Sequence, residues 1–152
     1  IARELDTDEN VWRRLLDQNA EKLRQVSALL AADYGFRSAV NSDDEETIQS
    51  VLENHGSRIG AEVTALLDTR LNLRSLSASG GARDFQAAVG QVAPLLANQP
   101  QGSRMAVIGG VPYQFVMVPM RAAARRLSQP SSPLATPWTA STMVSNASSL
   151  VR

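Results

Sequence analysis

The sequence predicts an α+β domain in which a long N-terminal helix and shorter helices pack on one face of an antiparallel sheet of roughly four to six strands. Three patterns support this class. Helical spacing of apolar residues runs through residues 7–36, a helix-start signal opens a second helix at residues 43–55, and period-two alternation marks strands at residues 59–67 and 105–120. Helices and strands that follow one another in this order favour a mixed fold over an all-helical one.

Composition excludes several classes of protein. The chain has 152 residues, of which 43% are hydrophobic and 20% charged, which suits one globular domain. It has no cysteine, so disulfides, zinc thiolate sites and thiol nucleophiles are excluded. No apolar run approaches the length of about 20 residues that spans a bilayer. No signal peptide opens the chain either, and we expect the targeting segment to be missing from it.

The charges are unevenly distributed along the chain. All fifteen acidic residues lie at or before Asp84, whereas five arginines and no acid follow it. These arginines are scattered rather than gathered in a stripe, so we expect no nucleic-acid partner.

The first helix carries a seam with a period of about 3.5 residues, the spacing that pairs helices side by side. Asn19 decides how the seam is interpreted, because a buried Asn that faces its symmetry mate fixes the register of a parallel dimer. The alternative is a partly solvated Asn on a helix that packs on the domain's own sheet, and both interpretations stay open. The seam consists of Trp12, Leu16, Asn19, Leu23, Val26 and Leu30.

Local signals define where the first two helices begin and end. We expect the first helix to end or bend at Tyr34-Gly35-Phe36, where glycine lets the backbone leave helical angles. Ser42 to Glu45 has capping-box spacing, and Gly56 should stop the helix that follows. The buried face of this second helix is predicted to hold Ile48, Val51, Leu52 and His55.

Two strands and a third helix are expected next. Residues 59–67 alternate and then run apolar, which predicts a strand, and Asp68-Thr69-Arg70 should turn the chain into a second strand that begins near Leu71. Asp84 is a candidate cap for a helix whose apolar face includes Phe85, Val89 and Val92, and Pro94 should break or kink it.

A hairpin and an atypical tail complete the chain. Gly109-Gly110 accept the positive φ of a tight turn between strands at residues 105–108 and 111–120. Tyr113, Phe115 and Met117 should point to one face of the sheet and Val116, Val118 and Met120 to the other. The tail, residues 122–152, is rich in Ser, Ala and Pro, so we expect mostly irregular structure with one strand near residues 136–144; a shifted reading frame near Arg121 is an alternative explanation of its composition.

Catalysis and metal binding are not expected of this chain. Its one histidine, His55, stands too close to Ser57 for a serine triad, and no nucleophile-elbow motif is present. One histidine with dispersed carboxylates has no recognisable metal-ligand spacing. We therefore predict neither an enzyme nor a metalloprotein.

Three motifs follow one another in residues 33–68: DYGFR with SAV, then ENHGSRIGAE, then a hydrophobic strand that ends in LLD. In this order the segment resembles the extracytoplasmic Cache-type sensor domains of bacterial membrane-bound signalling proteins. The resemblance implies a PAS/Cache-like fold without a cofactor. It divides the chain into an N-terminal signalling helix at residues 1–36, a sensor core at 37–121 and the tail.

The resemblance also implies a function and a location. Such a domain sits in the periplasm between two transmembrane helices, which are absent from this chain, and works as a homodimer. It would regulate cytoplasmic GGDEF or EAL domains that make or break cyclic di-GMP. The sensor of a chemoreceptor or histidine kinase remains an alternative, as does a structural dimerisation module without a ligand.

By the same resemblance, ligands lie between the sheet and the segments that cover it, which places a pocket edge at residues 55–58. Arg58 would hold the carboxylate of a small anion in a bidentate pair. The alternative is that Arg58 forms an ion pair with Glu53 or Glu62. The other candidates for the ligand site are His55, Tyr113 and Asp68.

Overall fold

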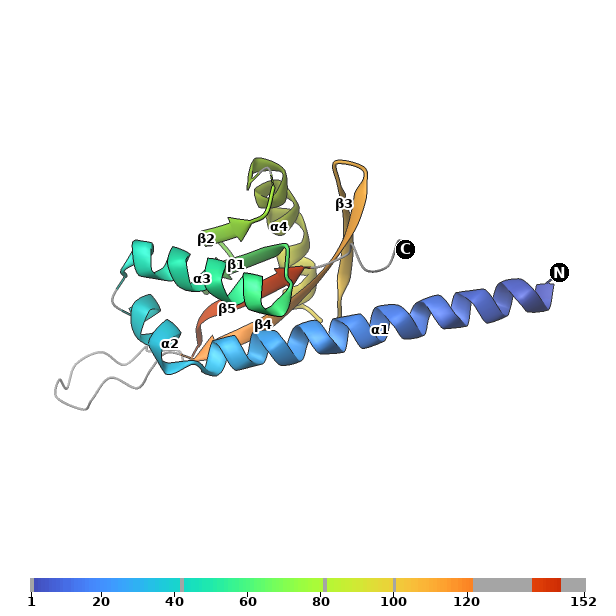
Figure 1. Ribbon diagram of the computed structural model, residues 1–152, viewed down its shortest axis with the longest axis horizontal. Coiled ribbons are helices and arrows are strands. Elements are labelled where there is room, and N and C mark those ends of the chain that lie inside the picture. Colours follow the sequence, from blue (N-terminus) through green and yellow to red (C-terminus); the bar gives the residue numbers. More distant parts are fainter. Residues whose placement is uncertain (1, 42, 81, 100, 122–137, 146–152) are drawn as a thin grey trace.

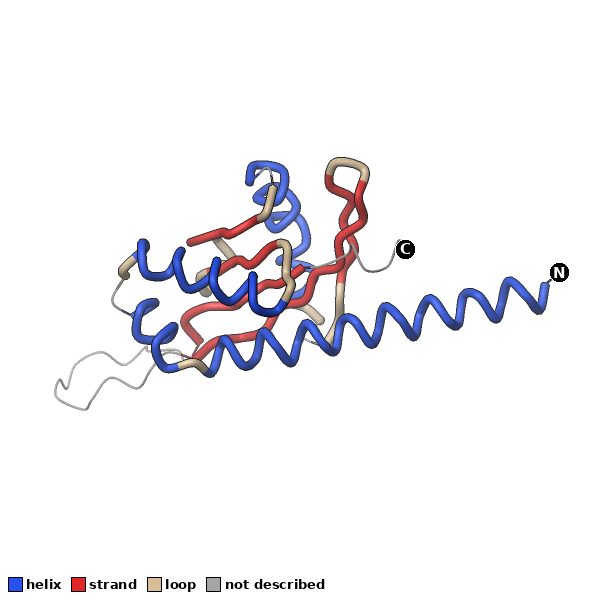
Figure 2. The backbone as a smooth tube through the Cα atoms, viewed as in Figure 1, coloured by secondary structure: helices blue, strands red, loops and turns tan. Residues whose placement is uncertain are grey.

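The computed structural model describes residues 2–41, 43–80, 82–99, 101–121 and 138–145. It has an α+β fold, as predicted, with helices on both faces of one sheet (Figures 1 and 2). In chain order the elements are α1 (Ala2–Ala32), α2 (Tyr34–Asn41), α3 (Glu45–Ile59), β1 (Val63–Leu67), β2 (Leu73–Ala78), α4 (Ala82–Ala97), β3 (Arg104–Ile108), β4 (Val111–Arg121) and β5 (Trp138–Ser145).

The sheet has five strands in the order β2-β1-β5-β4-β3, and every neighbouring pair is antiparallel. The last strand in sequence is thus the central strand in space. Met143 of β5 pairs with Ala65 of β1 on one side and with Met117 of β4 on the other. The strand expected near residues 136–144 is present as β5, and the rest of the predicted irregular tail lies outside the described residues.

Each face of the sheet has its own core, because successive side chains in a strand point to opposite sides. On the α4 side, Phe115 packs with Val89 and Leu96 of that helix. On the opposite side, Val116 packs with Leu23 of α1, and Met120 joins the cluster that contains α2 and α3. The predicted alternation along residues 113–120 is confirmed, but the helices cover both faces rather than one.

The first helix ends earlier than the sequence predicts. Asp33 separates α1 from α2, and its Oδ1 accepts a hydrogen bond of 2.7 Å from the backbone N–H of Phe36. This is the arrangement of an N-cap, which satisfies an N–H group that has no partner inside the helix. Tyr34-Gly35-Phe36 therefore begins a new helix instead of ending the old one.

The prediction that Gly56 stops α3 is wrong, as is the prediction that a strand begins at Ile59. Asp44 caps α3 by accepting from the N–H of Thr47 at 3.1 Å, and the helix runs through Gly56 and Ile59 to Gly60. Gly56 is buried, and a Cβ there would lie 3.2 Å from Cγ2 of Thr64. The glycine permits close helix–strand packing, and Gly60, with φ of 66°, forms the actual stop.

The predicted third helix is present as α4, but it begins at Ala82, so Asp84 lies in its first turn and does not precede it. Pro94 lies inside the helix and does not end it. Leu96, which is buried in the core under the α4 side of the sheet, holds the last turn in place after the proline. Tertiary packing here outweighs the hydrogen bond that a proline removes.

Two glycines give opposite expectations for substitution by alanine. Gly60→Ala should destabilise the domain by about 1–2 kcal/mol, because an L-residue in the left-handed region is strained. Gly90→Ala is the matched control, since Gly90 is exposed inside α4 with open space around it, and alanine there should stabilise by about 0.5–1 kcal/mol. Urea denaturation of both variants measures the difference, and equal effects would contradict the assigned backbone conformation.

Candidate functional site

A hollow of about 310 Å³ opens on the α4 side of the sheet, between the first turn of α4 and the β3–β4 hairpin. We call it the α4-side hollow. Its walls combine two carboxylates, two aromatic rings and aliphatic side chains, so it offers both apolar contact and hydrogen-bonding groups. The lining residues are Glu62, Ser79, Gly80, Asp84, Phe85, Ile108, Gly109, Val111 and Tyr113.

The two aromatic rings of this hollow are fixed against each other. Phe85 and Tyr113 meet edge to face, with ring centroids 5.1 Å apart and planes at 87°. Tyr113 is only 8% exposed. Burial raises the pKa of the Tyr113 phenol above 10.0, and its hydrogen bond with Glu62 and the charge of that carboxylate raise the pKa further. Tyr113 therefore stays protonated at neutral pH, and its hydroxyl donates to the Glu62 carboxylate at the edge of the hollow.

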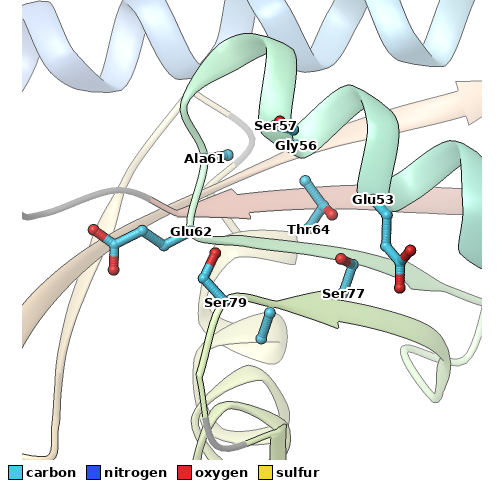
Figure 3. A pocket seen from close by; sticks show the side chains of 9 residues that line it. Glu53, Gly56, Ser57, Ala61, Glu62, Thr64, Ser77 and Ser79 are labelled. Atoms are coloured by element: carbon cyan, nitrogen blue, oxygen red, sulfur yellow. The ribbon is translucent and has the colours of Figure 1, made fainter.

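A second hollow, of about 290 Å³, lies where the C-terminal part of α3 crosses β1 and β2. We call it the α3-side hollow. Figure 3 shows the Glu53 and Glu62 carboxylates at opposite ends of it, with Ser77 and Ser79 between them. Glu62 and Ser79 line both hollows, so the two meet at the start of β1 and the end of β2.

The structure does not bring the four predicted site residues together. Tyr113 lines the α4-side hollow, whereas Arg58 is exposed in the last turn of α3 and lines neither hollow. His55 is half-buried, and its Nε2 lies 3.4 Å from the carbonyl oxygen of Val26, so it bridges α3 and α1. The residues next to it, Gly56 and Ser57, do line the α3-side hollow.

Asp68 organises the turn between β1 and β2. Its Oδ1 accepts hydrogen bonds of 2.8 Å from the backbone N–H groups of Arg70 and Asn72, and its Oδ2 accepts one of 3.1 Å from the Asn72 side chain. Burial alone would raise the pKa of Asp68, but the hydrogen bonds from Asn72 and Arg70, with the charge of Arg70, outweigh it and lower the pKa below 3.8. The geometry accounts for Asp68 as a turn residue.

Sequence reasoning missed most of the α4-side hollow. Local patterns assign Asp84 and Phe85 only to a helix, and they offer Glu62 only as an ion-pair partner for Arg58. The hairpin alternation did place Tyr113 on the correct face of the sheet. Nothing in the local sequence indicates that the start of α4 and the start of β1 meet beside this tyrosine, because their proximity depends on strand order.

Residues of the predicted dimer seam lie along α1 in two different environments. Leu23 and Leu30 are buried against the domain's own sheet and helices. Asn19 donates from Nδ2 to Oε1 of Gln114 on β4 at 2.7 Å, which is the intramolecular alternative for this residue. Trp12 is 50% exposed. The remaining members, Leu16 and Val26, are half-buried.

No group of three or more His, Asp or Glu side chains in the described part of the chain is arranged to hold a metal ion. Among the described helices, none combines the length and the apolar character needed to cross a membrane.

Comparison with known proteins identifies one family. Residues 1–76, which extend from α1 into β2, match a Cache-type family described as "Double sensory domain of two-component sensor kinase". No curated protein matches the chain. The matched half includes α1, α3 and β1, and with them the Glu62 side of both hollows.

Asp68 should make the stability of the folded domain sensitive to acid. Because its pKa is lowered in the folded state, its contribution to stability is complete above the ordinary value of 3.8 and is lost as pH falls through the folded value. Asp68→Asn should lower Tm at neutral pH and flatten the fall in Tm between about pH 5 and about pH 2. Asp17→Asn, on the exposed surface of α1, is the control. An unchanged acid slope in Asp68→Asn would contradict this role.

Proposed function

The chain belongs to the Cache-type family of double sensory domains of two-component sensor kinases, and we propose on this premise that it is the ligand-sensing input domain of such a kinase. Domains of this family sense and do not catalyse, and they act outside the cytoplasm. The observation that carries the proposal is the family match over residues 1–76 together with the α+β fold that contains them.

A histidine-kinase output is favoured over cyclic di-GMP turnover. The description of the matched family names a sensor kinase, whereas GGDEF and EAL domains rest on the sequence resemblance alone. In the full-length protein the domain would be periplasmic and held by flanking transmembrane helices. Ligand binding would then change the output only by its differential affinity for two arrangements of the domain.

The α4-side hollow is the proposed ligand site. Its size and its mixture of aromatic, aliphatic and carboxylate groups suit a small polar molecule with an apolar part. The described lining contains Glu62 and Asp84 but no lysine or arginine, so a ligand that donates hydrogen bonds fits better than an anion held by Arg58. A hollow of this kind also argues against a ligand-free dimerisation module.

Homodimerisation remains a proposal, and it now concerns the N-terminal part of α1. Every described side chain from Thr7 to Leu15 is exposed, and this stretch projects beyond the rest of the domain (Figure 1). We call residues 7–15 the α1 arm. Val11, Trp12 and Leu15 provide its apolar surface. Such a surface is suited to pairing with the same arm of a second copy.

A thermal-shift screen of amines, amino acids, carboxylates and phosphates tests the ligand site. A ligand at about 100 times its Kd should stabilise the domain by about 2.7 kcal/mol. Asp84→Asn and Tyr113→Phe should each reduce this shift, whereas Arg58→Ala should leave it intact. In the full-length protein the same ligand should change autophosphorylation of the kinase and leave cyclic di-GMP levels unaltered.

The opposite results would each remove part of the proposal. A shift abolished by Arg58→Ala alone would return the site to the anion pocket expected from the sequence. No shift with any compound would favour the ligand-free dimerisation module, and a ligand-dependent change in cyclic di-GMP would replace the kinase output.

Sedimentation at high protein concentration tests the dimer. Trp12→Glu should convert dimer to monomer, because it places a charge in the apolar surface of the α1 arm. Leu29→Glu is the matched control, since Leu29 is 70% exposed on α1 but lies outside both the arm and the seam. A monomer in the parent protein, or equal effects of the two variants, would count against pairing through the arm.

A further inference from the structure

The strand that forms part of the α4-side hollow also carries the residue that fastens α1 to the sheet. Tyr113 of β4 faces the hollow, and its neighbour Gln114 faces α1 on the opposite side of the sheet. Gln114 is only 1% exposed. The hollow and the attachment of α1 are therefore separated by one peptide unit of the same strand.

Three hydrogen bonds occupy the Gln114 amide. Its Oε1 accepts from Nδ2 of Asn19 at 2.7 Å, and its Nε2 donates to the backbone carbonyl of Leu16 at 2.9 Å and to Oγ of Ser103 at 2.9 Å. We call this set of four residues the Gln114 clamp. Both amide hydrogens are used, and a buried polar group without a partner is strongly disfavoured, so the clamp permits one position of α1 relative to β4.

A second contact joins α1 to the loop that contains Ser103 and leads into β3. Arg24 of α1 donates from its guanidinium to the carbonyl oxygens of Gln101 at 2.7 Å and Gly102 at 3.3 Å. Arg24 thus attaches this loop to α1, and Ser103 of the same loop belongs to the clamp through its hydrogen bond with Gln114. These contacts hold α1 against the hairpin that borders the hollow.

The clamp is also the place where α1 leaves the domain. Leu16 is half-buried, and the α1 arm begins at the next residue toward the N-terminus. At about 1.5 Å per residue the arm extends roughly 13 Å beyond the clamp. A small displacement at Leu16 is therefore enlarged along the arm, as it would be along a lever.

We propose that Gln114 is a positioning residue that couples the state of the α4-side hollow to the orientation of the α1 arm. A ligand that displaces Tyr113 moves the adjacent peptide. The Gln114 amide then gives up its hydrogen bonds with Leu16 and Asn19 for others. Because these bonds are either formed or broken, the response of α1 has discrete states. The coupling rests on the proposed function, since it assigns the hollow as the sensing site.

Spin-label distance measurements test the coupling without a ligand. The chain has no cysteine, so Asn10→Cys on the arm and Gln91→Cys on the exposed surface of α4 accept labels specifically. The parent should give one narrow distance distribution. Tyr113→Phe removes the hydroxyl that bonds Glu62, and Tyr113→Ala removes the ring; both should shift the distribution, the second more than the first.

The Gln114 clamp should be required for this shift. Gln114→Leu should broaden the distribution and make it insensitive to either change at Tyr113. If Gln114→Leu does not fold, Asn19→Ala gives the same test, because alanine favours the helical conformation of α1. Gln18→Ala, an exposed neighbour of Asn19 on α1, is the control that should keep the response.

Two results would overturn the proposal. One is an arm whose distance distribution does not shift in either Tyr113 variant. The other is a shift that keeps its full size when Asn19→Ala or Gln114→Leu is added to the Tyr113 variant. Neither result depends on whether a ligand is found. If no ligand is found but the distance distribution shifts in a clamp-dependent way, only the proposed sensing site is removed. If a ligand is found but the arm does not move, only the coupling is removed.

Discussion

The double burial of β4 is the constraint on which the rest of the structure depends. This strand pairs with β3 on one edge and β5 on the other, and helices cover both of its faces. Its side chains must therefore satisfy two cores at once, and most of them are apolar for that reason. Gln114 is polar and nevertheless buried on this strand, and three hydrogen bonds compensate its burial.

The two faces of the sheet differ in their chemistry. One face carries the hollow proposed as the ligand site, and the other carries the contacts that attach α1. On the α4 side, apolar packing leaves a hollow beside Tyr113 and Phe85, where a ligand could replace solvent. On the α1 side, directed hydrogen bonds from Gln114 and Arg24 fix the position of a helix that extends beyond the domain. Directed hydrogen bonds depend more strongly on geometry than apolar contacts do, so in the proposed coupling a movement on the first face would break or keep specific bonds on the second.

The two hollows meet at the end of the sheet where β1 begins and β2 ends. The backbone N–H of Ser79 donates to the carbonyl of Glu62 at 3.0 Å, which joins the two strands just beyond their paired segments. Both residues line both hollows. The hydrogen bonds of Asp68 fix the turn at the opposite end of these two strands. The fixed turn and the accessible hollows therefore lie at different ends of the same pair of strands.

The sequence by itself determined the features that depend on neighbouring residues. The periodicity of residues 7–36, the acidic first turn of α3, the Gly109-Gly110 hairpin and the alternation along β4 each follow from local stereochemistry, and together they predicted the α+β class. The order DYGFR, ENHGSRIGAE and LLD also indicated the Cache-type family. Errors at Gly56 and Pro94 arose where packing against Thr64 and burial of Leu96 outweighed a local signal. Only the tertiary structure decided that β5 is central, that Asn19 meets Gln114, and that Glu62, Asp84 and Tyr113 share one hollow while Arg58 lies outside it. These contacts join residues far apart in the sequence, and strand order, which no local pattern encodes, brings them together.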